Sequence, residues 1–216
     1  MKIGDNSAVK NVSEKTIRRL SHYARCLRLA RINGTAVLTS KYLSGRCGIS
    51  SAAVRKDLAA FGEFGKQGFG YKVSELLENI ERILGTCDPP PVIVIGAGHI
   101  GSALLESGLD GTGGYQYSAI FDNDPQIIGK TIAGVTVQPV SDIESIVTDH
   151  ADVIAIVAVS SGEGQNAVNN LVSKGCMAIL SFSLEPLDVP DDVVLRYVEV
   201  STELDLLTHS MKSRNL

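Results

Sequence analysis

The sequence has no apolar run of about 18 residues, so it contains no candidate for a membrane-spanning helix. Its opening residues, Met1 to Asn6, also lack the apolar core of a signal peptide. We therefore expect a cytoplasmic protein that makes no contact with a membrane.

Cysteine is scarce and scattered. Cys26, Cys47, Cys87 and Cys176 include no C-x-x-C pair, which argues against a disulfide framework and against a zinc site. The pattern favours a reducing compartment and a protein without a metal. We expect each cysteine to be a buried apolar filler, and the sequence leaves a single reactive thiol open.

The charge is divided unevenly along a chain of ordinary globular composition. The 216 residues are 44% hydrophobic and 20% charged, with a net charge of −4. Residues 1–85 carry 15 Lys and Arg against 7 Asp and Glu, whereas residues 86–216 carry 5 against 17. A basic first segment beside an acidic second one predicts that only the first meets a polyanion.

Helical signals dominate the basic segment. Apolar residues from Ile17 to Leu27 recur at helical spacing and predict a first helix that ends at Asn33-Gly34. Thr39 or Ser40 caps a short second helix that runs through Leu43 and is broken at Gly45 and Gly48. Further elements are expected as a third helix capped by Ser50 or Ser51 over residues 52–61, a glycine-rich hairpin over 62–70, a strand at 71–73 and a capped helix over 74–84.

This order predicts a winged helix-turn-helix whose third helix enters the DNA major groove. The outward face of that helix carries Ser51, Arg55 and Lys56, and the hairpin tip carries Lys66, Gln67 and Gly68 for contact with the minor groove. A basic pair often only solvates a helix face. The positive charge of the segment and the hairpin favour DNA contact.

Three consecutive prolines, Pro89 to Pro91, predict a stiff linker because proline neither continues a helix nor donates a ladder hydrogen bond. We divide the chain into a DNA-binding domain at 1–85, a linker at 86–91, a nucleotide-binding domain at 92–200 and a terminal helix at 201–216.

The strongest motif follows the linker. Residues 92–95 form an apolar strand that leads into G-x-G-x-x-G at 96–101, and a second apolar run delivers Asp122 about 20 residues later. Gly96 permits the tight turn, Gly98 lets the backbone approach a pyrophosphate, and Gly101 lets helix pack on strand. Asp122 is placed to accept hydrogen bonds from ribose hydroxyls and to repel a 2′-phosphate, which favours NAD(H). The alternative is a glycine-rich turn in another α/β unit.

Strands and helices then alternate as in a doubly wound parallel sheet, an α/β fold of the Rossmann type. Loops at the carboxyl ends of its strands should line the cofactor crevice. Phe182 either packs near the nicotinamide or fills the core, and His99 is more typical of a supporting residue than of a catalyst. The expected cofactor-binding residues are Gly96, Ala97, Gly98, His99, Ile100, Gly101, Asp122, Val159, Ser160, Phe182 and Ser183.

A last helix is predicted over residues 202–211, where Leu204, Leu207 and Met211 fall at helical spacing. It follows a complete α/β unit, and no later element covers it. We expect this helix to pack on another subunit.

Taken together, the chain resembles the Rex family of redox-sensing transcriptional repressors over nearly its whole length. Residues 54–71 look like that family's recognition helix and wing, residues 19–25 like its first helix, and Gly96 to Gly101 with Asp122 like its NAD(H) site. The resemblance implies a homodimer that exchanges its C-terminal helices. Such a repressor occupies a palindromic operator in double-stranded DNA when NAD⁺ prevails and leaves it when NADH accumulates.

Two positions depart from the family pattern. Family members usually carry tyrosine near the position of Ser107 and aspartate where this chain has Glu199. In the family these side chains join residues like Arg25 in a network that changes with redox state. Arg25 and Glu199 are therefore our candidates for redox coupling.

Two other functions stay open on the sequence. One is an NAD-dependent oxidoreductase with a basic accessory domain, but we find no Tyr-x-x-x-Lys or His/Asp pair that could act as acid or base, and we assign no catalytic residue. The other is a DNA-bound dimer that uses NAD structurally or responds to a different ligand.

Overall fold

The structure is a computed structural model that describes residues 12–62, 64–66, 69–108, 115–149 and 152–213. The described chain divides into two compact units between Pro89 and Pro90, inside the proline-rich segment. Each unit has its own hydrophobic core.

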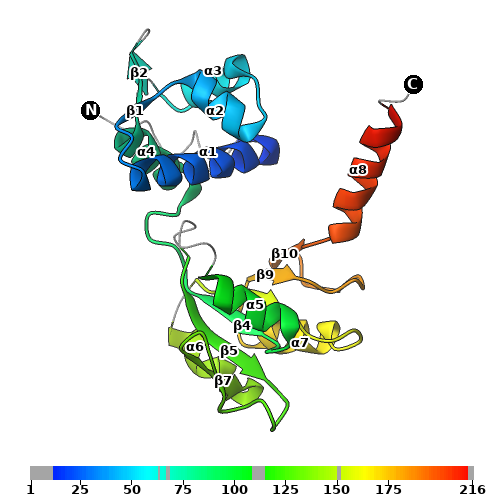
Figure 1. The fold of residues 1–216 in the computed structure, drawn as a ribbon. Helices are drawn as coiled ribbons and strands as arrows, with labels where there is room; N and C mark the ends of the chain where they lie inside the picture. The colour runs from blue at the N-terminus through cyan, green and yellow to red at the C-terminus, as the bar shows by residue number, and fades with distance from the viewer. Residues whose placement is uncertain (1–11, 63, 67–68, 109–114, 150–151, 214–216) are drawn as a thin grey trace. The chain divides into compact units, whose positions relative to one another are not determined.

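The described part of the first unit contains the helices α1 to α4, labelled in Figure 1, and a small antiparallel sheet in the order β1-β3-β2. Its elements are α1 (Glu14–Ile32), β1 (Val37–Leu38), α2 (Ser40–Cys47), α3 (Ser51–Ala59), β2 (Gly65–Lys66), β3 (Gly70–Lys72) and α4 (Val73–Leu84). This is the helix order of the predicted winged helix-turn-helix.

Polar caps and apolar faces explain these helices. The side chains of Ser13, Thr39 and Ser50 accept backbone N–H bonds at the starts of α1, α2 and α3. The helices bury one continuous core, which includes Leu20, Tyr23, Leu27, Leu43, Val54, Leu58, Leu76 and Ile80.

Several boundaries differ from the sequence prediction. Helix α2 is not broken at Gly45 and ends only where Gly48 adopts a left-handed φ of 64°. Helix α3 ends at Ala59, so Phe61 lies in the following turn, and α4 begins at Val73 without a side-chain cap. Strand β1 was not predicted, because two residues carry no detectable periodicity.

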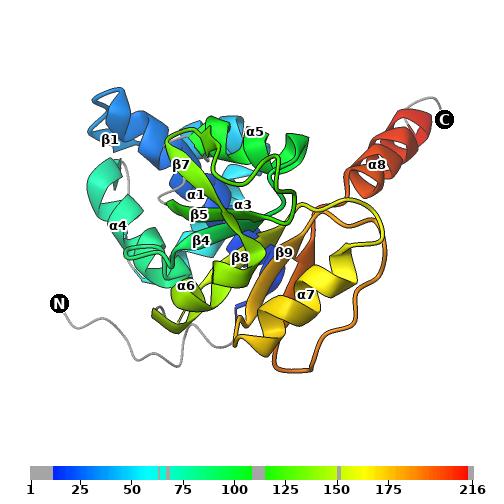
Figure 2. The same ribbon diagram turned by 90° about the horizontal axis from the view of Figure 1, so that it is seen from below.

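The described part of the second unit is built on a seven-stranded sheet in the order β10-β9-β8-β4-β5-β7-β6, parallel except for β6. Figure 2 labels its five inner strands, from β9 to β7. Its strands are β4 (Val92–Ile95), β5 (Tyr117–Asp122), β6 (Thr131–Ile132), β7 (Val135–Pro139), β8 (Ile154–Val157), β9 (Ala178–Ser181) and β10 (Val194–Tyr197). The six parallel strands have the order of a Rossmann fold, which confirms the predicted fold class.

Helices cover both faces of this sheet. Leu105 of α5 (His99–Ser107) packs in one apolar cluster with Val92, Val94 and Ile120. Residues of α6 (Ile143–Asp149) and α7 (Gly164–Ser173) pack in another cluster with the alternate strand residues, such as Ile93 and Ile95. Period-two alternation along β4 thus supplies both cores. A short 3₁₀ helix, η3 (Val140–Asp142), precedes α6.

The chain ends in α8 (Val200–Ser213), longer at both ends than the predicted 202–211. None of its described residues is buried. The edge strands β6 and β10 were missed because they are short and mostly exposed. In the described part of the chain, no helix is long and apolar enough to cross a membrane.

Candidate functional site

The glycine loop between β4 and α5 depends on glycine at two positions for steric reasons. Gly96 has a φ of 100°, and a Cβ added there would lie 2.5 Å from the carbonyl oxygen of Ala158. A Cβ on Gly101 would collide with the carbonyl oxygen of Gly96. A Cβ on Gly98 would meet only open space, so the backbone at the start of α5 is accessible to an incoming group. A helix N-terminus open in this way favours an anion.

Asp122, at the end of β5, is tied to this loop. Its Oδ2 accepts the N–H of Ala97 at 2.7 Å, and its Oδ1 accepts the N–H of Asp124 at 2.9 Å. We predicted a role toward ribose only. The structure adds a bracing role, because the same carboxylate fixes the glycine-loop backbone.

A cavity of about 510 Å³ opens where β4, β5 and β8 end, at the topological switch point of the sheet. Five of the predicted cofactor residues line it: Gly96, Gly98, Asp122, Val159 and Ser160. Sequence reasoning missed several polar lining residues that follow β5 or lie on α7. They are Asn123, Asp124, Glu163, Asn166 and Asn170. Only Asn123 and Asp124 had an available signal, because they come directly after an apolar strand.

The other predicted cofactor residues do not line this cavity. Ala97 is buried within the loop and Gly101 beneath it, whereas His99 and Ile100 are exposed on the first turn of α5. Phe182 is half-buried and packs against the cluster of Val92, Val94 and Leu105, which matches the core alternative.

Ser183 lies in a turn of its own. Its N–H donates to Ser181 Oγ at 3.0 Å, and its Oγ accepts the N–H of Glu185 at 3.2 Å. These local bonds fix the loop after β9.

The residues that concern redox coupling occupy exposed positions. Ser107 donates its hydroxyl to the carbonyl of Leu104 at 2.8 Å, and Glu199 accepts a hydrogen bond from Thr202 at 2.7 Å. Arg25 is exposed on α1 of the first unit, while Glu199 precedes α8 in the second. Their predicted network stays a prediction.

Helix α3 presents a basic outer face. Val54 and Leu58 are buried in the core, whereas Arg55 and Lys56 are exposed. Arg55 donates to Ser40 Oγ at 3.3 Å, and Ser51 Oγ lies 3.5 Å from the carbonyl of Ser40. These contacts hold the start of α3 against α2.

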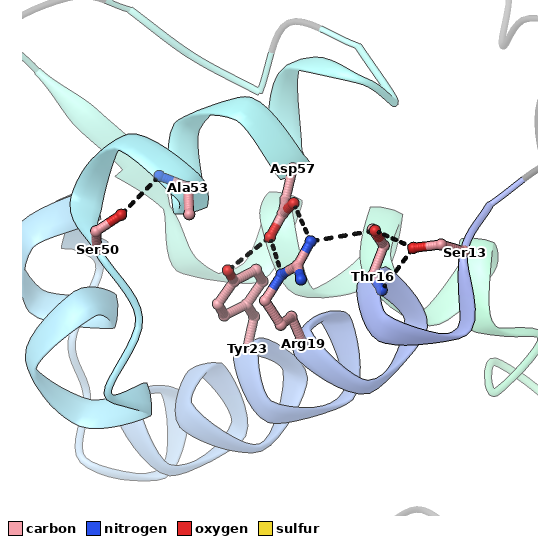
Figure 3. Close-up of polar contacts among 7 residues, drawn as sticks. All are labelled: Ser13, Thr16, Arg19, Tyr23, Ser50, Ala53 and Asp57. Atoms are coloured by element: carbon pink, nitrogen blue, oxygen red, sulfur yellow. Dashed lines mark hydrogen bonds and ion pairs between the residues drawn. The ribbon is translucent and has the colours of Figure 1, made fainter. Parts of the chain in front are cut away.

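A buried carboxylate locks α3 onto α1 (Figure 3). Arg19 donates to both oxygens of Asp57, at 2.6 and 2.7 Å, and the Tyr23 hydroxyl donates to Oδ2 at 2.9 Å. Burial by itself would raise the pKa of Asp57, but the hydrogen bonds from Arg19 and Tyr23 and the Arg19 charge lower it below its ordinary value. Sequence analysis missed this network, since a single aspartate on a helix gives no signal of its partners.

The hairpin after α3 joins β2 to β3, with Lys66 opposite Gly70. Gly70 has a φ of 80°, and a Cβ there would lie 2.5 Å from the Leu38 carbonyl oxygen, so the hairpin packs closely on β1. Phe69 is 79% exposed. The predicted contacts Gln67 and Gly68 lie outside the described residues.

Two family models match the chain. Residues 11–59 match "Putative DNA-binding protein N-terminus", and residues 88–184 match "CoA binding domain". The first match covers α1 to α3, and the second covers the glycine loop and the parallel sheet up to the loop after β9.

Curated relatives match almost from end to end. The chain is 41% identical over 209 residues to the redox-sensing transcriptional repressor Rex of Syntrophomonas wolfei, covering 96% of this chain and 99% of that protein. It is 39% identical over 200 residues to the protein of the same name from Desulforamulus reducens, covering 93% and 95%.

Solved structures of RSP, a Rex-family repressor, also match. The complex of RSP with NAD⁺ and operator DNA aligns with a TM-score of 0.80 and 34% identity, covering 94% of both chains. The complex with NADH aligns with a TM-score of 0.79 and 32% identity, covering 95% of this chain and 96% of RSP.

Proposed function

Because this chain belongs to the Rex family of redox-sensing transcriptional repressors, we propose that its two units divide the work of such a repressor between them. The chain is a DNA-binding repressor that senses the NADH/NAD⁺ ratio, and it is not an enzyme. The observation that carries the assignment is the joint presence of a switch-point cavity with a glycine loop and a basic helix α3 in one chain.

For the cofactor, we assign the pyrophosphate to the backbone at Gly98, where the start of α5 is open. The adenosine ribose binds beside Asp122, and the neighbouring carboxylate of Asp124 adds to the repulsion of a 2′-phosphate. The remaining predicted positions belong to the proposed site or to the segments that support it. They are Ala97, His99, Ile100, Gly101, Val159, Ser160, Phe182 and Ser183.

For DNA, we assign Arg55, Lys56 and Ser51 of α3 to the major groove and the hairpin residues 66–68 to the adjacent minor groove. Support comes from the exposure of Arg55 and Lys56 and from the positive charge of residues 1–85. The operator is a palindrome in double-stranded DNA because the repressor is a homodimer with two equivalent reading units.

For the dimer, α8 crosses to a second subunit. Its apolar side chains are widely exposed: Leu204 at 56%, Leu207 at 60% and Met211 at 69%. An apolar stripe of this kind needs cover in water. Removal of residues 202–216 should give monomers or aggregates that fail to bind the palindrome. Light scattering that showed a dimer still responsive to NADH would refute the exchanged helix.

The proposed domains are the DNA-binding domain at 1–85, the linker at 86–91, the nucleotide-binding domain at 92–200 and the terminal helix at 201–216. The proposed compartment is the cytoplasm. NADH binding alters the spacing of the two α3 helices, with Arg25 and Glu199 as coupling candidates. To shift the population from 1:99 to 99:1, a ligand must favour one state by about 10⁴-fold.

Operator affinity measured against the NADH/NAD⁺ ratio tests this function. We expect tight binding with NAD⁺ and release as NADH rises. An affinity that is independent of the ratio would indicate a structural cofactor or another ligand. Hydride transfer to a small substrate with turnover would indicate an enzyme instead.

A further inference from the structure

Two of the four cysteines lie in contact, although 21 positions separate them in the sequence. The sulfur atoms of Cys26 on α1 and Cys47 on α2 are 3.3 Å apart, and both side chains are half-buried. Cys87 is exposed and Cys176 is buried, so the expectation that all four are buried fillers is wrong. The spacing shows no C-x-x-C pattern, and only the packing of α2 on α1 brings the thiols together.

We propose that Cys26 and Cys47 form a reversible disulfide that gives the DNA-binding unit a second redox input, independent of the dinucleotide cavity. The oxidant is a hydroperoxide or a low-molecular-weight disulfide. With hydrogen peroxide, a cysteine thiolate attacks one oxygen and the O–O bond breaks. The departing hydroxide takes up the proton that the thiol released, so that a sulfenic acid and one water form. The second thiol attacks that sulfur, forms the S–S bond and releases a second water. Two thiols thus lose two electrons and two protons in total, and the peroxide gains them.

The local environment slows the oxidation of the pair. Burial, together with the hydrogen bond and charge of Cys26, raises the pKa of the Cys47 thiol to about 12. Because the thiolate is the nucleophile, the raised pKa slows whichever step Cys47 performs. The pair therefore registers sustained oxidation rather than brief pulses.

The location of the pair links it to DNA reading. Cys47 is the last residue of α2, Gly48 turns the chain in the left-handed conformation, and Ser50 caps α3. A disulfide requires an S–S distance of about 2.0 Å, so the sulfur atoms must approach by about 1.3 Å. Helix α3 is held to α1 by Asp57 and cannot follow α2 freely. The strain therefore falls on the turn before α3 and on the contacts of Ser51 and Arg55 in α3 with Ser40 at the start of α2.

The test uses the full-length protein, first reduced and then treated with hydrogen peroxide or with oxidised glutathione. Peptide mapping by mass spectrometry should find residues 26 and 47 joined, with the loss of two hydrogens. Operator affinity should fall by about tenfold and recover after addition of dithiothreitol, while NADH affinity stays unchanged.

Cys26→Ser and Cys47→Ser should each remove the cross-link and the oxidant sensitivity, and Cys87→Ser is the matched control that retains both. Cys47→Ala serves as a second variant if serine disturbs the packing of α2, and circular dichroism checks that each variant is folded. The proposal is overturned if mapping finds Cys26 and Cys47 unpaired, or modified one by one, after the other thiols have reacted. It is equally overturned if the cross-link forms and operator affinity does not change. Operator binding by the reduced protein is measured first, so a failure of the proposed function is recognised separately.

Discussion

Replacing Asp57 should loosen the recognition helix from the first helix and destabilise the first unit. Asp57 is 6% exposed and accepts three hydrogen bonds from Arg19 and Tyr23. Loss of one partner of a buried ion pair costs about 3–5 kcal/mol because the other charge is left uncompensated. The Arg19 side chain is 22% exposed and can partly rehydrate, so we expect about 3 kcal/mol for Asp57→Ala, at the low end of that range.

Hydrogen exchange of the full-length protein, read by mass spectrometry on peptides from α1 and α3, reports the first unit by itself. Asp57→Ala should lower the free energy of opening in both peptides. Tyr23→Phe, which removes one hydrogen bond to the charged carboxylate, should cost about 1.5 kcal/mol. The matched control is Glu78→Gln, which breaks an exposed pair with Arg82 and should cost at most about 0.5 kcal/mol.

The effect should also depend on pH with a definite sign. The folded-state pKa of Asp57 lies below its ordinary value, so the stabilisation is complete above that ordinary value, which is about 3.9. It is lost as the pH falls through the folded-state pKa. The difference in the free energy of opening between wild type and Asp57→Asn should therefore be constant near neutral pH and become smaller in acid. Equal protection of wild type and Asp57→Ala at pH 7 would refute the reasoning.

Three further predictions concern the two binding sites. Arg55→Ala and Lys56→Ala should each weaken operator binding. The loss should be about 1–3 kcal/mol if the side chain contacts a base, and the salt dependence of binding should fall by about one if it contacts a phosphate. NADH affinity should not change, and operator titrations that are unaltered in both variants would remove α3 from the interface. Asp122→Ala should narrow the preference for NADH over NADPH. It should also weaken NADH binding by about 10-fold or more, because the Ala97 N–H loses a hydrogen bond to a charged group. If calorimetry gave the same ratio of NADH to NADPH affinity as in wild type, another residue would make this selection. Gly98→Ala should leave thermal stability intact and reduce dinucleotide affinity. Gly101→Ala should reduce both, since only a Cβ at position 101 meets the Gly96 carbonyl. Equal melting temperatures for the two variants would contradict this account.

The sequence predicts those parts of the protein in which a local pattern has a single physical meaning. The apolar run at 92–95, the glycine loop and Asp122 define a strand, a turn and an acid at one sheet edge, and the structure has them there. Helix caps were predicted at Thr39 or Ser40 and at Ser50 or Ser51, and the structure has them at Thr39 and Ser50. The fold class of the second unit follows from these signals, whereas the family resemblance also depends on residues 19–25 and 54–71.

What escaped prediction depends on contacts between distant residues. Asp57 meets Arg19 across 38 positions, and Cys26 meets Cys47 across 21, so neither pair leaves a trace in local periodicity. The polar residues on α7, such as Asn166 and Asn170, face the cavity only because of the crossover that brings this helix to the switch point. The prediction that Gly45 breaks the second helix is wrong. A glycine costs a helix only about 1 kcal/mol, and the burial of Leu43 helps to offset that cost, so that α2 continues to Cys47.

The Asp57 network also restricts how a ligand can control DNA binding. Helix α3 is fixed to α1 by one carboxylate with three donors, and its apolar side is closed by Val54 and Leu58. A movement of α3 between two positions inside the first unit would have to break these bonds, at a cost similar to that of the Asp57→Ala substitution.

A dinucleotide in the second unit can avoid that cost if it displaces the first unit as a rigid body. In a homodimer this displacement changes the distance between two intact recognition helices, and a palindromic operator responds to that distance because its half-sites have a fixed spacing. The Cys26–Cys47 pair differs in kind, since it acts inside the unit on the turn before α3. We therefore expect the two proposed redox inputs to have separable effects: NADH should alter the spacing between the reading units, whereas the disulfide should alter the reading surface itself.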